Sequence, residues 1–188
     1  MHRHRRSEQG LAVVEMTIML PLLLMMVFGG FEIYRLLLAN NIIIGMSREG
    51  ANLVARTTEP EQKVMEVLST TATPLVMKDH GTMFVTVLVG TADGKPPRVQ
   101  EQYRWTGSSY SEKSESRVWS GCGSADADSS YWDNGSCKLP DTRPTLASFD
   151  MEMTEGETIH VVEVMYQYEN IIAYAITDDL ELYSRSLL

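Results

Sequence analysis

Histidine, cysteine and basic side chains are scarce in this sequence. Of its 188 residues, 4 are histidine and 2 are cysteine, and 16 lysines and arginines stand against 25 aspartates and glutamates. The net charge of −9 argues against binding to nucleic acid, which selects basic surfaces. Only His80 and His160 lie beyond the first ten residues, and no serine elbow, phosphate-binding loop or paired-histidine motif occurs. The sequence therefore predicts no catalytic centre, no metal site and no cofactor.

The basic residues are unevenly distributed. Residues 1–10 contain Arg3, Arg5 and Arg6 and one acidic residue, Glu8. The remainder has 16 − 3 = 13 basic and 25 − 1 = 24 acidic side chains, a net charge of −11. A basic start followed by an acidic remainder indicates a chain that lies on both sides of a membrane.

A long apolar run follows this basic start. Met16–Phe31 contains no charged residue, and the run counted from Leu11 has a helical length of about 32 Å, which matches a bilayer. Glu32 and Arg35 mark its far boundary and can neutralise each other three residues apart on a helix. We expect a single transmembrane helix over residues 11–35, with the N-terminus in the cytoplasm because arginines stay on that side.

The apolar pattern continues beyond the membrane segment. No small-x-small cleavage site follows Gly29 and Gly30, so a removed secretory signal is not predicted. Apolar residues recur at helical spacing in "LLLANNIIIGMSREGANLV", which predicts a helix extension over residues 36–58. Pro21 is expected to kink the helix without ending it, because lipid offers no partner for free backbone groups.

A carboxylate stands just inside the apolar run. Glu15 is costly in hydrocarbon unless it is paired or lies at the membrane edge, so a function is the default interpretation. Cleavage after Gly10 would create a new amine at Leu11, one helical turn from Glu15. The two charges could pair within one chain or between neighbouring chains, where an unpaired member is costly. The alternative is that Glu15 is only an interface charge.

The stretch "GLAVVEMTIMLPLLLMMVFGGFEIYR" resembles the TadE/TadF-like minor pilins, or pseudopilins, of the tight adherence (Tad/Flp) type IV pilus system. One shared feature is a glycine, Gly10, with a glutamate, Glu15, five residues later. The others are Leu20 and Pro21 before a leucine run, and then a Gly and a Glu before Arg35. The resemblance implies a leader, residues 1–10, which a prepilin peptidase removes between Gly10 and Leu11. It assigns Glu15 to the register of subunit packing.

The same resemblance implies the cellular setting. The chain would be a non-enzymatic, single-pass protein of the bacterial inner membrane, whose periplasmic domain takes part in pilus assembly and cell adhesion. Its partners would be the prepilin peptidase, related pilin subunits and the inner-membrane assembly platform. Met16 after Glu15 and the large following domain favour a minor over a major pilin. A membrane-anchored periplasmic enzyme or receptor is the alternative, and a deep pocket with convergent polar groups would favour it.

Residues 59–188 indicate an exported α+β domain. Thr58 and Glu61 have the spacing of a capping box, with Pro60 in the first turn, and the helix should stop before Pro74. Its expected apolar face consists of Val64, Val67 and Leu68. This helix or the anchor helix should cover the apolar face of a sheet.

Four segments have the composition of strands: residues 82–89, 99–105, 158–168 and, more weakly, 180–188. The first two are separated by a turn-rich stretch and should form a hairpin in an antiparallel sheet. Alternation in the second predicts one face composed of Val99, Tyr103 and Trp105.

The segment from Ser108 to Ser148 is rich in Ser, Gly and Asp and holds both cysteines. Outside the cytoplasm two cysteines usually pair, so a disulfide between Cys122 and Cys137 is expected, worth about 3 kcal/mol for a loop of this size. Two thiols without a nearby histidine or second pair are incomplete for zinc. We expect a disulfide-closed surface loop.

The same segment contains Asp126, Asp128 and Ser130, which have the spacing of calcium-loop oxygens. An EF-hand would need glycine and glutamate where Tyr131 and Cys137 stand, so solvated turn residues are the preferred interpretation.

Three aromatic residues lie in this otherwise polar segment. Aromatic side chains in a polar loop either cover the sheet or form a contact surface, and the sequence favours neither. The residues concerned are Trp119, Tyr131 and Trp132.

Overall fold

The computed structural model describes residues 4–92, 95–110, 114–123, 131–147, 149, 151, 153–170 and 180–188, with side chains from Ala12 onward. The chain divides into two compact units. One consists of Met1–Leu38 and Glu169–Asp179, and the other of Ala39–Tyr168 and Leu180–Leu188.

Helix α1, His4–Arg56, begins in the first unit and is 53 residues long. It continues through Pro21, as the sequence predicted. From Ala12 it is long and apolar enough to cross a membrane, with a mean hydropathy of 2.1 in its most apolar window and none of that window buried. The expected pair between Glu32 and Arg35 forms, with 3.6 Å between the carboxylate and guanidinium atoms. The long N-terminal apolar helix is thus confirmed.

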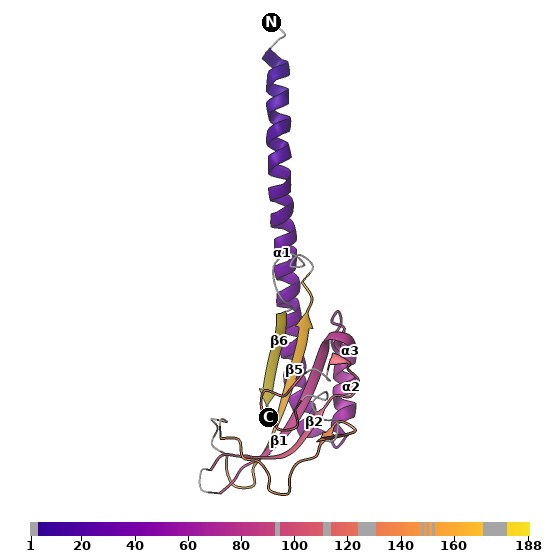
Figure 1. Ribbon diagram of the computed structural model, residues 1–188, viewed down its shortest axis with the longest axis vertical. Coiled ribbons are helices and arrows are strands. Elements are labelled where there is room, and N and C mark those ends of the chain that lie inside the picture. Colours follow the sequence, from indigo (N-terminus) through magenta and orange to yellow (C-terminus); the bar gives the residue numbers. More distant parts are fainter. Residues whose placement is uncertain are drawn as a thin grey trace. The chain divides into compact units, whose positions relative to one another are not determined.

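The second unit contains an antiparallel sheet with the strand order β3-β4-β2-β1-β5-β6 (Figure 1). Every expected strand is present and the predicted hairpin is β1–β2. The strands are β1 (Gly81–Val89), β2 (Arg98–Arg104), β3 (Trp132–Asp133), β4 (Ser136–Cys137), β5 (Thr158–Tyr168) and β6 (Leu180–Leu187). Two further helices, α2 (Glu61–Thr71) and α3 (Met77–His80), precede β1. The α+β class is confirmed.

Helix α2 begins differently from the expectation. Pro60 occupies the position before the first turn, and no side chain caps that turn. The capping box between Thr58 and Glu61 is therefore wrong. The hydroxyl of Thr57 instead accepts a hydrogen bond from the backbone N–H of Glu59 at 3.1 Å, so the polar side chain orders the turn that leads into the helix.

The buried face of α2 is rotated from the predicted one. Val64 and Leu68 are buried as expected, but Val67 is 51% exposed and Met65 is buried instead. Val67 was therefore assigned to the wrong face. Met65 and Leu68, one and four positions after Val64, lie on the side of the helix that faces the sheet. Val67, three positions after Val64, lies at the edge of that side, where solvent reaches it.

A β-bulge explains a second difference. Leu88 pairs with Val99 and Val87 pairs with Glu101, so Gln100 is an extra residue in β2. One extra residue reverses the alternation of faces. The prediction that Val99 shares a face with the two aromatic residues at the end of the strand is therefore wrong.

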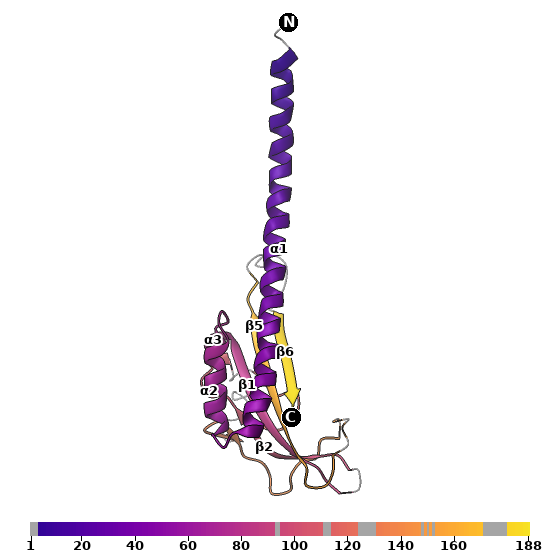
Figure 2. The ribbon, with the colours of Figure 1, turned by 180° about the vertical axis from the view of Figure 1, so that it is seen from behind.

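Helices cover one face of the sheet. Figure 2 shows α2 and the last turns of α1 lying over the strands. The hydroxyl of Ser47 in α1 is 2.8 Å from that of Ser184 in β6. A Cβ atom at Gly50 would lie 3.0 Å from side-chain atoms of both Leu68 and Val162, so glycine permits the close approach of α1 to α2 and β5. Both helices offered as alternatives by the sequence pack on the sheet.

The opposite face is covered by described residues between Tyr110 and Glu157, here called the cover segment, while β3 and β4 within this range extend the sheet. Its apolar residues join those of the sheet in two buried clusters. One contains Leu88, Val99, Val118, Leu146, Met153, Ile159 and Val161, and the other Phe84, Cys122, Trp132, Cys137 and Met165. The expected disulfide-closed loop is present, and its few apolar side chains also contribute to the hydrophobic core, which the sequence did not predict.

Candidate functional site

The predicted processing and packing residues lie in the first turns of α1. Gly10 and Leu11 are helical, and their side chains are outside the described set. Glu15 lies one turn further along, exposed, and forms no hydrogen bond or ion pair with any residue that the structure describes. Thr17, the next polar residue, donates its hydroxyl hydrogen bond to the carbonyl of Val13 at 2.7 Å. Among the described residues, a carboxylate thus stands unpaired on an apolar helix.

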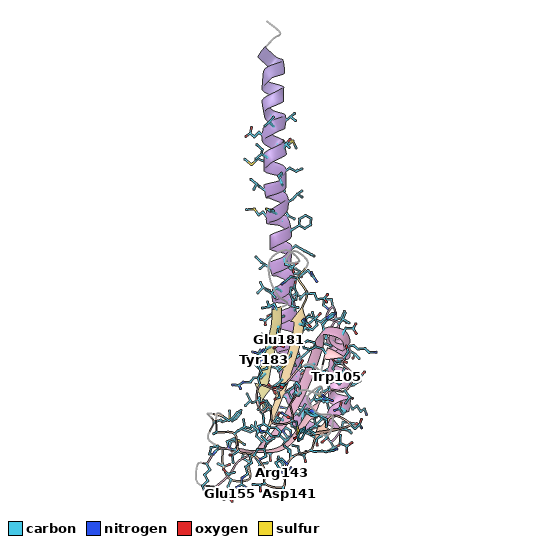
Figure 3. All side chains as sticks on the ribbon, viewed as in Figure 1. Trp105, Asp141, Arg143, Glu155, Glu181 and Tyr183 are labelled. Atoms are coloured by element: carbon cyan, nitrogen blue, oxygen red, sulfur yellow. A yellow bond between two sulfur atoms is a disulfide. The ribbon has the colours of Figure 1, made fainter. Side chains whose placement is uncertain are left out.

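The helix around and after Glu15 presents large apolar side chains on all sides (Figure 3). Met26 is 81% exposed and Met25 75%. Each fully buried side chain of this size stabilises by about 1.5–3 kcal/mol, so an apolar surface of this extent indicates contact with lipid or other helices. A Cβ atom at Gly29 or Gly30 would have no described neighbouring atom within 4 Å, so both glycines leave room for a close helix.

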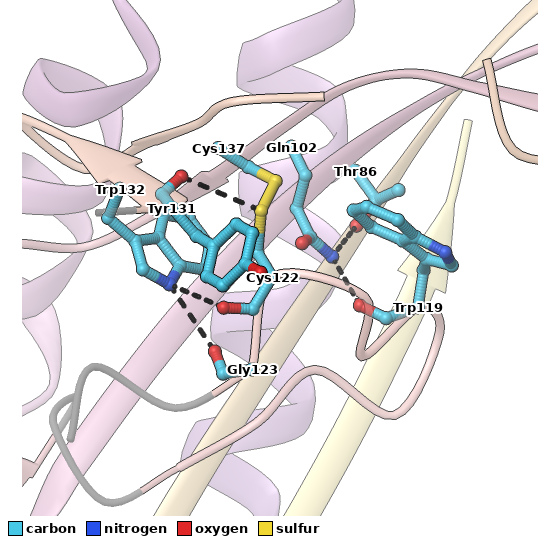
Figure 4. The surroundings of a disulfide bond; sticks show 8 residues. All are labelled: Thr86, Gln102, Trp119, Cys122, Gly123, Tyr131, Trp132 and Cys137. Atoms are coloured by element: carbon cyan, nitrogen blue, oxygen red, sulfur yellow. Dashed lines mark hydrogen bonds between the residues drawn. A yellow bond between two sulfur atoms is a disulfide. The ribbon is translucent and has the colours of Figure 1, made fainter. Parts of the chain in front are cut away.

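The disulfide between Cys122 and Cys137 is present (Figure 4). Both half-cystines are buried. The indole N–H of Trp132 donates to the carbonyl of Cys122 at 3.1 Å and to that of Gly123 at 3.3 Å. The ring of Trp132 also lies 6.4 Å from that of Phe84 in β1. The disulfide therefore holds the short strands and their tryptophan against the sheet.

The three aromatic residues of the cover segment have different surroundings. Trp132 is 7% exposed, and Trp119 is partly buried and packs on both apolar clusters. The backbone carbonyl of Trp119 accepts a hydrogen bond from the side chain of Gln102 at 2.8 Å. Tyr131 is 50% exposed. The two tryptophans therefore pack on the core, and of the three aromatic residues only Tyr131 is exposed.

Glu163 was not singled out from the sequence, although a carboxylate inside the apolar strand "TIHVVEVMYQY" marked it. It is fully buried in β5. Its carboxylate accepts hydrogen bonds from the hydroxyl of Ser116, from the backbone N–H groups of Arg117 (2.9 Å) and Val118 (3.1 Å), and from the hydroxyl of Tyr183 (2.9 Å). Burial raises the pKa of Glu163, and these four donors act against that rise. Glu163 thus ties the cover segment to the sheet.

A second polar cluster lies beside this anchor. Glu181 in β6 accepts hydrogen bonds from the Arg117 guanidinium and, at 2.9 Å, from the hydroxyl of Tyr110. Burial, together with the hydrogen bond to Glu181, raises the pKa of Tyr110 to about 12. The guanidinium of Arg117 also lies 4.5 Å from the ring centre of Tyr183. These contacts fix the cover segment to β6.

Two hollows lie at the surface of the second unit. One, of about 560 Å³, is lined by the end of α2, residues 75–78 and residues 105–107, and beside it the indole of Trp105 donates to Glu66 at 2.9 Å. The other, of about 310 Å³, lies at the β1–β2 turn. Glu163 and the half-buried His160 line neither of them. Burial lowers the pKa of His160, and the nearby Glu61 and Glu101 oppose this effect.

Potential metal ligands are dispersed in the described part of the chain. There, no three His, Cys, Asp or Glu side chains gather closely enough to hold a metal ion. Asp126, Asp128 and Ser130, the residues with calcium-loop spacing, lie outside the described residues.

The match to known proteins is confined to the N-terminal helix. Residues 10–52 match the family model described as TadE-like protein. The match begins at Gly10, includes Glu15 and ends four residues before the end of α1 at Arg56. No curated protein and no solved structure matches the chain. The resemblance predicted from the sequence is confirmed: residues 10–52 of this chain are similar to TadE-like proteins.

Proposed function

We propose that the chain is a non-enzymatic minor pilin, or pseudopilin, of a Tad/Flp pilus, which takes part in assembly or initiation of the pilus. The observation that carries this proposal is the TadE-like match over residues 10–52, on a helix whose apolar side chains are exposed from Ala12 to Phe28. A helix of this kind needs lipid before assembly and neighbouring helices after it. Association with the Tad system follows from the family, and the role within it is our proposal.

The proposed organisation follows the charges and the helix. Residues 1–10 are a cytoplasmic leader, residues 11–35 cross the bacterial inner membrane, residues 36–58 extend the helix, and residues 59–188 form the periplasmic domain. The arginines of the leader support this orientation. The disulfide supports an oxidising compartment for the domain. Partners are the prepilin peptidase, related subunits and the inner-membrane assembly platform.

Glu15 sets the register of packing in this proposal. After cleavage between Gly10 and Leu11, the new amine is a cation in a position to meet the Glu15 carboxylate of a neighbouring helix. Glu15 is exposed and unpaired among the described residues, so its carboxylate is available for such a contact. In a low dielectric an unpaired charge is costly, so helices align where the two charges meet.

Mass spectrometry of the mature N-terminus tests the proposal. Protein from cells that express the cognate prepilin peptidase should begin at Leu11, and Gly10→Val should retain the leader because a branched side chain blocks approach to the scissile carbonyl. Gly29→Val is the matched control, since no described atom lies within 4 Å of a Cβ at that position, and it should be processed normally. Mature wild-type protein that still begins with the leader would contradict the pilin proposal.

A further inference from the structure

The two edges of the sheet differ in how much backbone they leave open. On one side, β3 and β4 have two residues each and β4 meets β2 only through Ser136 and Tyr103. The other end of β2 is closed by a hydrogen bond from the N–H of Val99 to the carbonyl of Pro144 at 2.9 Å. On the opposite side, β6 has eight residues and no described strand beyond it. β6 is therefore the long open edge.

The ladder between β5 and β6 fixes the direction of the backbone groups in β6. His160 and Leu188 exchange two hydrogen bonds, with N···O distances of 2.8 and 3.1 Å. In an antiparallel ladder bonded pairs alternate, so the even-numbered residues of β6 bond to β5. The N–H and C=O groups that point away from the sheet belong to Glu181, Tyr183, Arg185 and Leu187.

No backbone hydrogen bond from these four residues reaches another described residue. The outward N–H and C=O groups of β6 form a row of alternating donors and acceptors that can pair with the backbone of one more strand. Proteins in which such an edge binds nothing usually shorten the edge strand or cover it. An edge of this kind is recognised by an extended polypeptide through main-chain hydrogen bonds. We propose that the outer edge of β6 binds an extended segment of another protein as an added antiparallel strand.

The side chains that flank the edge define the chemistry of this segment. The charge of Glu181 is already met by Arg117 and its remaining oxygen by Tyr110. Arg185 is exposed and forms no ion pair in the described part of the chain. On the helix-covered face the edge presents Leu182, which is partly buried. The segment therefore carries an acidic side chain opposite Arg185 and apolar or small side chains on the helix side.

A second copy of the chain fits this edge less well. Two β6 strands paired about Tyr183 would set Arg185 against Glu181 of the other copy, whose charge Arg117 already neutralises. The end of α1 and β6 run in the same direction in the domain (Figure 2), so residue 39 of the two copies would lie at opposite ends of the joined sheet. Under the proposed function, the two chains would then enter the joined sheet from opposite ends, so this arrangement does not suit copies anchored in one membrane.

The probe is the acetylated peptide TVTEVTVTVK. When it runs antiparallel to β6, it places glutamate opposite Arg185 and threonine or valine opposite the other residues of the strand, and its terminal lysine lies beyond them. The full chain is studied in detergent micelles by amide hydrogen exchange. The peptide should protect the amides of Glu181, Tyr183, Arg185 and Leu187, which are unbonded in the free chain, and leave the even-numbered amides nearly unchanged. A peptide with lysine in place of glutamate should bind about two- to fivefold more weakly, the range of an exposed ion pair.

Two variants at one position separate backbone from side chain. Arg185→Pro removes an outward N–H and leaves the bonds to β5 intact, so it should fold and lose peptide binding. Arg185→Ala keeps the N–H, so it should bind the peptide and no longer distinguish glutamate from lysine. If the proline variant does not fold, the exchange pattern of the wild-type chain and peptide binding by the alanine variant still show whether the peptide pairs with the backbone of β6.

Three results would overturn the inference. The first is unchanged exchange of the four outward amides at millimolar peptide, and the second is equal binding by folded Arg185→Pro. The third is protection of these amides in the chain alone, rising with protein concentration, which would assign the edge to a second copy. None of these measurements depends on leader removal or pilus assembly, so a failure here leaves the proposed function to its own test.

Discussion

Glu163 is a buried carboxylate at the centre of an apolar strand, and its four hydrogen-bond donors come from the cover segment and from β6. Burying a carboxylate is costly, and buried carboxylates are therefore found where hydrogen-bond donors offset the loss of hydration. The consequence is that one side chain fixes the position of residues 116–118 on the sheet. An apolar residue at this position would leave two backbone N–H groups without a partner.

The raised pKa of Glu163 predicts the direction in which the stability of the fold changes with pH. Between its ordinary value of 4.5 and its higher folded value, the folded chain holds a proton that the unfolded chain has released. Stability should therefore fall as the pH rises through that interval. Glu163→Gln does not titrate, so it should remove this fall. Its amide oxygen can still accept from the N–H groups of Arg117 and Val118, but its NH2 group replaces the acceptor of the Ser116 hydroxyl, which should cost about 1–3 kcal/mol. Denaturant unfolding of the full chain in micelles measures both effects.

Ser116→Ala serves as the control for this prediction. It deletes one donor that lowers the pKa of Glu163 and keeps the titrating group, so the fall in stability should extend to higher pH. The same pH dependence in wild type and Glu163→Gln would assign the titration to another group.

The second prediction at this scale concerns Glu15. If it pairs with the Leu11 amine of a neighbouring subunit, Glu15→Gln should be processed and inserted but should lose crosslinking to partner pilins, because the amide carries no charge. Glu15→Asp keeps the charge and should retain most of the crosslinking. Equal crosslinking in wild type and Glu15→Gln would leave Glu15 as an interface charge.

At the scale of elements, the contact of α1 with α2 and β5 depends on Gly50, which has no side chain. Gly50→Val adds a branched group where a Cβ already lies 3.0 Å from Leu68 and Val162, so it should destabilise the domain by about 1–3 kcal/mol. Gly45→Val is the matched control on the same helix, because no described atom lies within 4 Å of a Cβ there. Its effect should stay within about 0.5 kcal/mol of wild type, as expected for an exposed position. Urea unfolding followed by tryptophan fluorescence compares the two, and equal losses would contradict the packing argument.

At the scale of the whole molecule, the prediction is topology. With the domain in the periplasm, Cys122 and Cys137 should resist thiol reagents in intact spheroplasts until a reductant is added, because they are bonded. External protease should then digest the domain. Labelling without reduction would contradict the disulfide, and complete protection from protease would reverse the proposed orientation.

Elements with a regular pattern were predictable from the sequence. The long apolar helix, the strands with sustained alternation and the pairing of the two cysteines all follow from local composition. Irregular features were not. The bulge at Gln100 arises from pairing with β1, and no pattern within β2 alone shows it. Strands β3 and β4 have two residues each and are too short for any periodicity.

The cover segment and the site illustrate the same limit. Val118, Leu146 and Met153 are far apart in a polar stretch, and only the folded chain brings them onto the sheet. Composition therefore indicated the loop but not the contribution of its apolar side chains to the hydrophobic core. At the other end of the chain, the motif around Gly10 and Glu15 was recognisable from a few residues because its spacing is short and fixed. The roles of these residues remain predictions.

The contact of Ser47 with Ser184 joins residues 137 positions apart in the sequence. Strand β6 lies at one edge of the sheet beside α1, yet it follows every other described strand in the sequence. The second unit cannot complete its sheet before β6 has been synthesised, since β5 and α1 lack this neighbour until then. Completion of the sheet is therefore a late step in folding that depends on contacts distant in sequence, and a chain interrupted before residue 180 would lack its sixth strand.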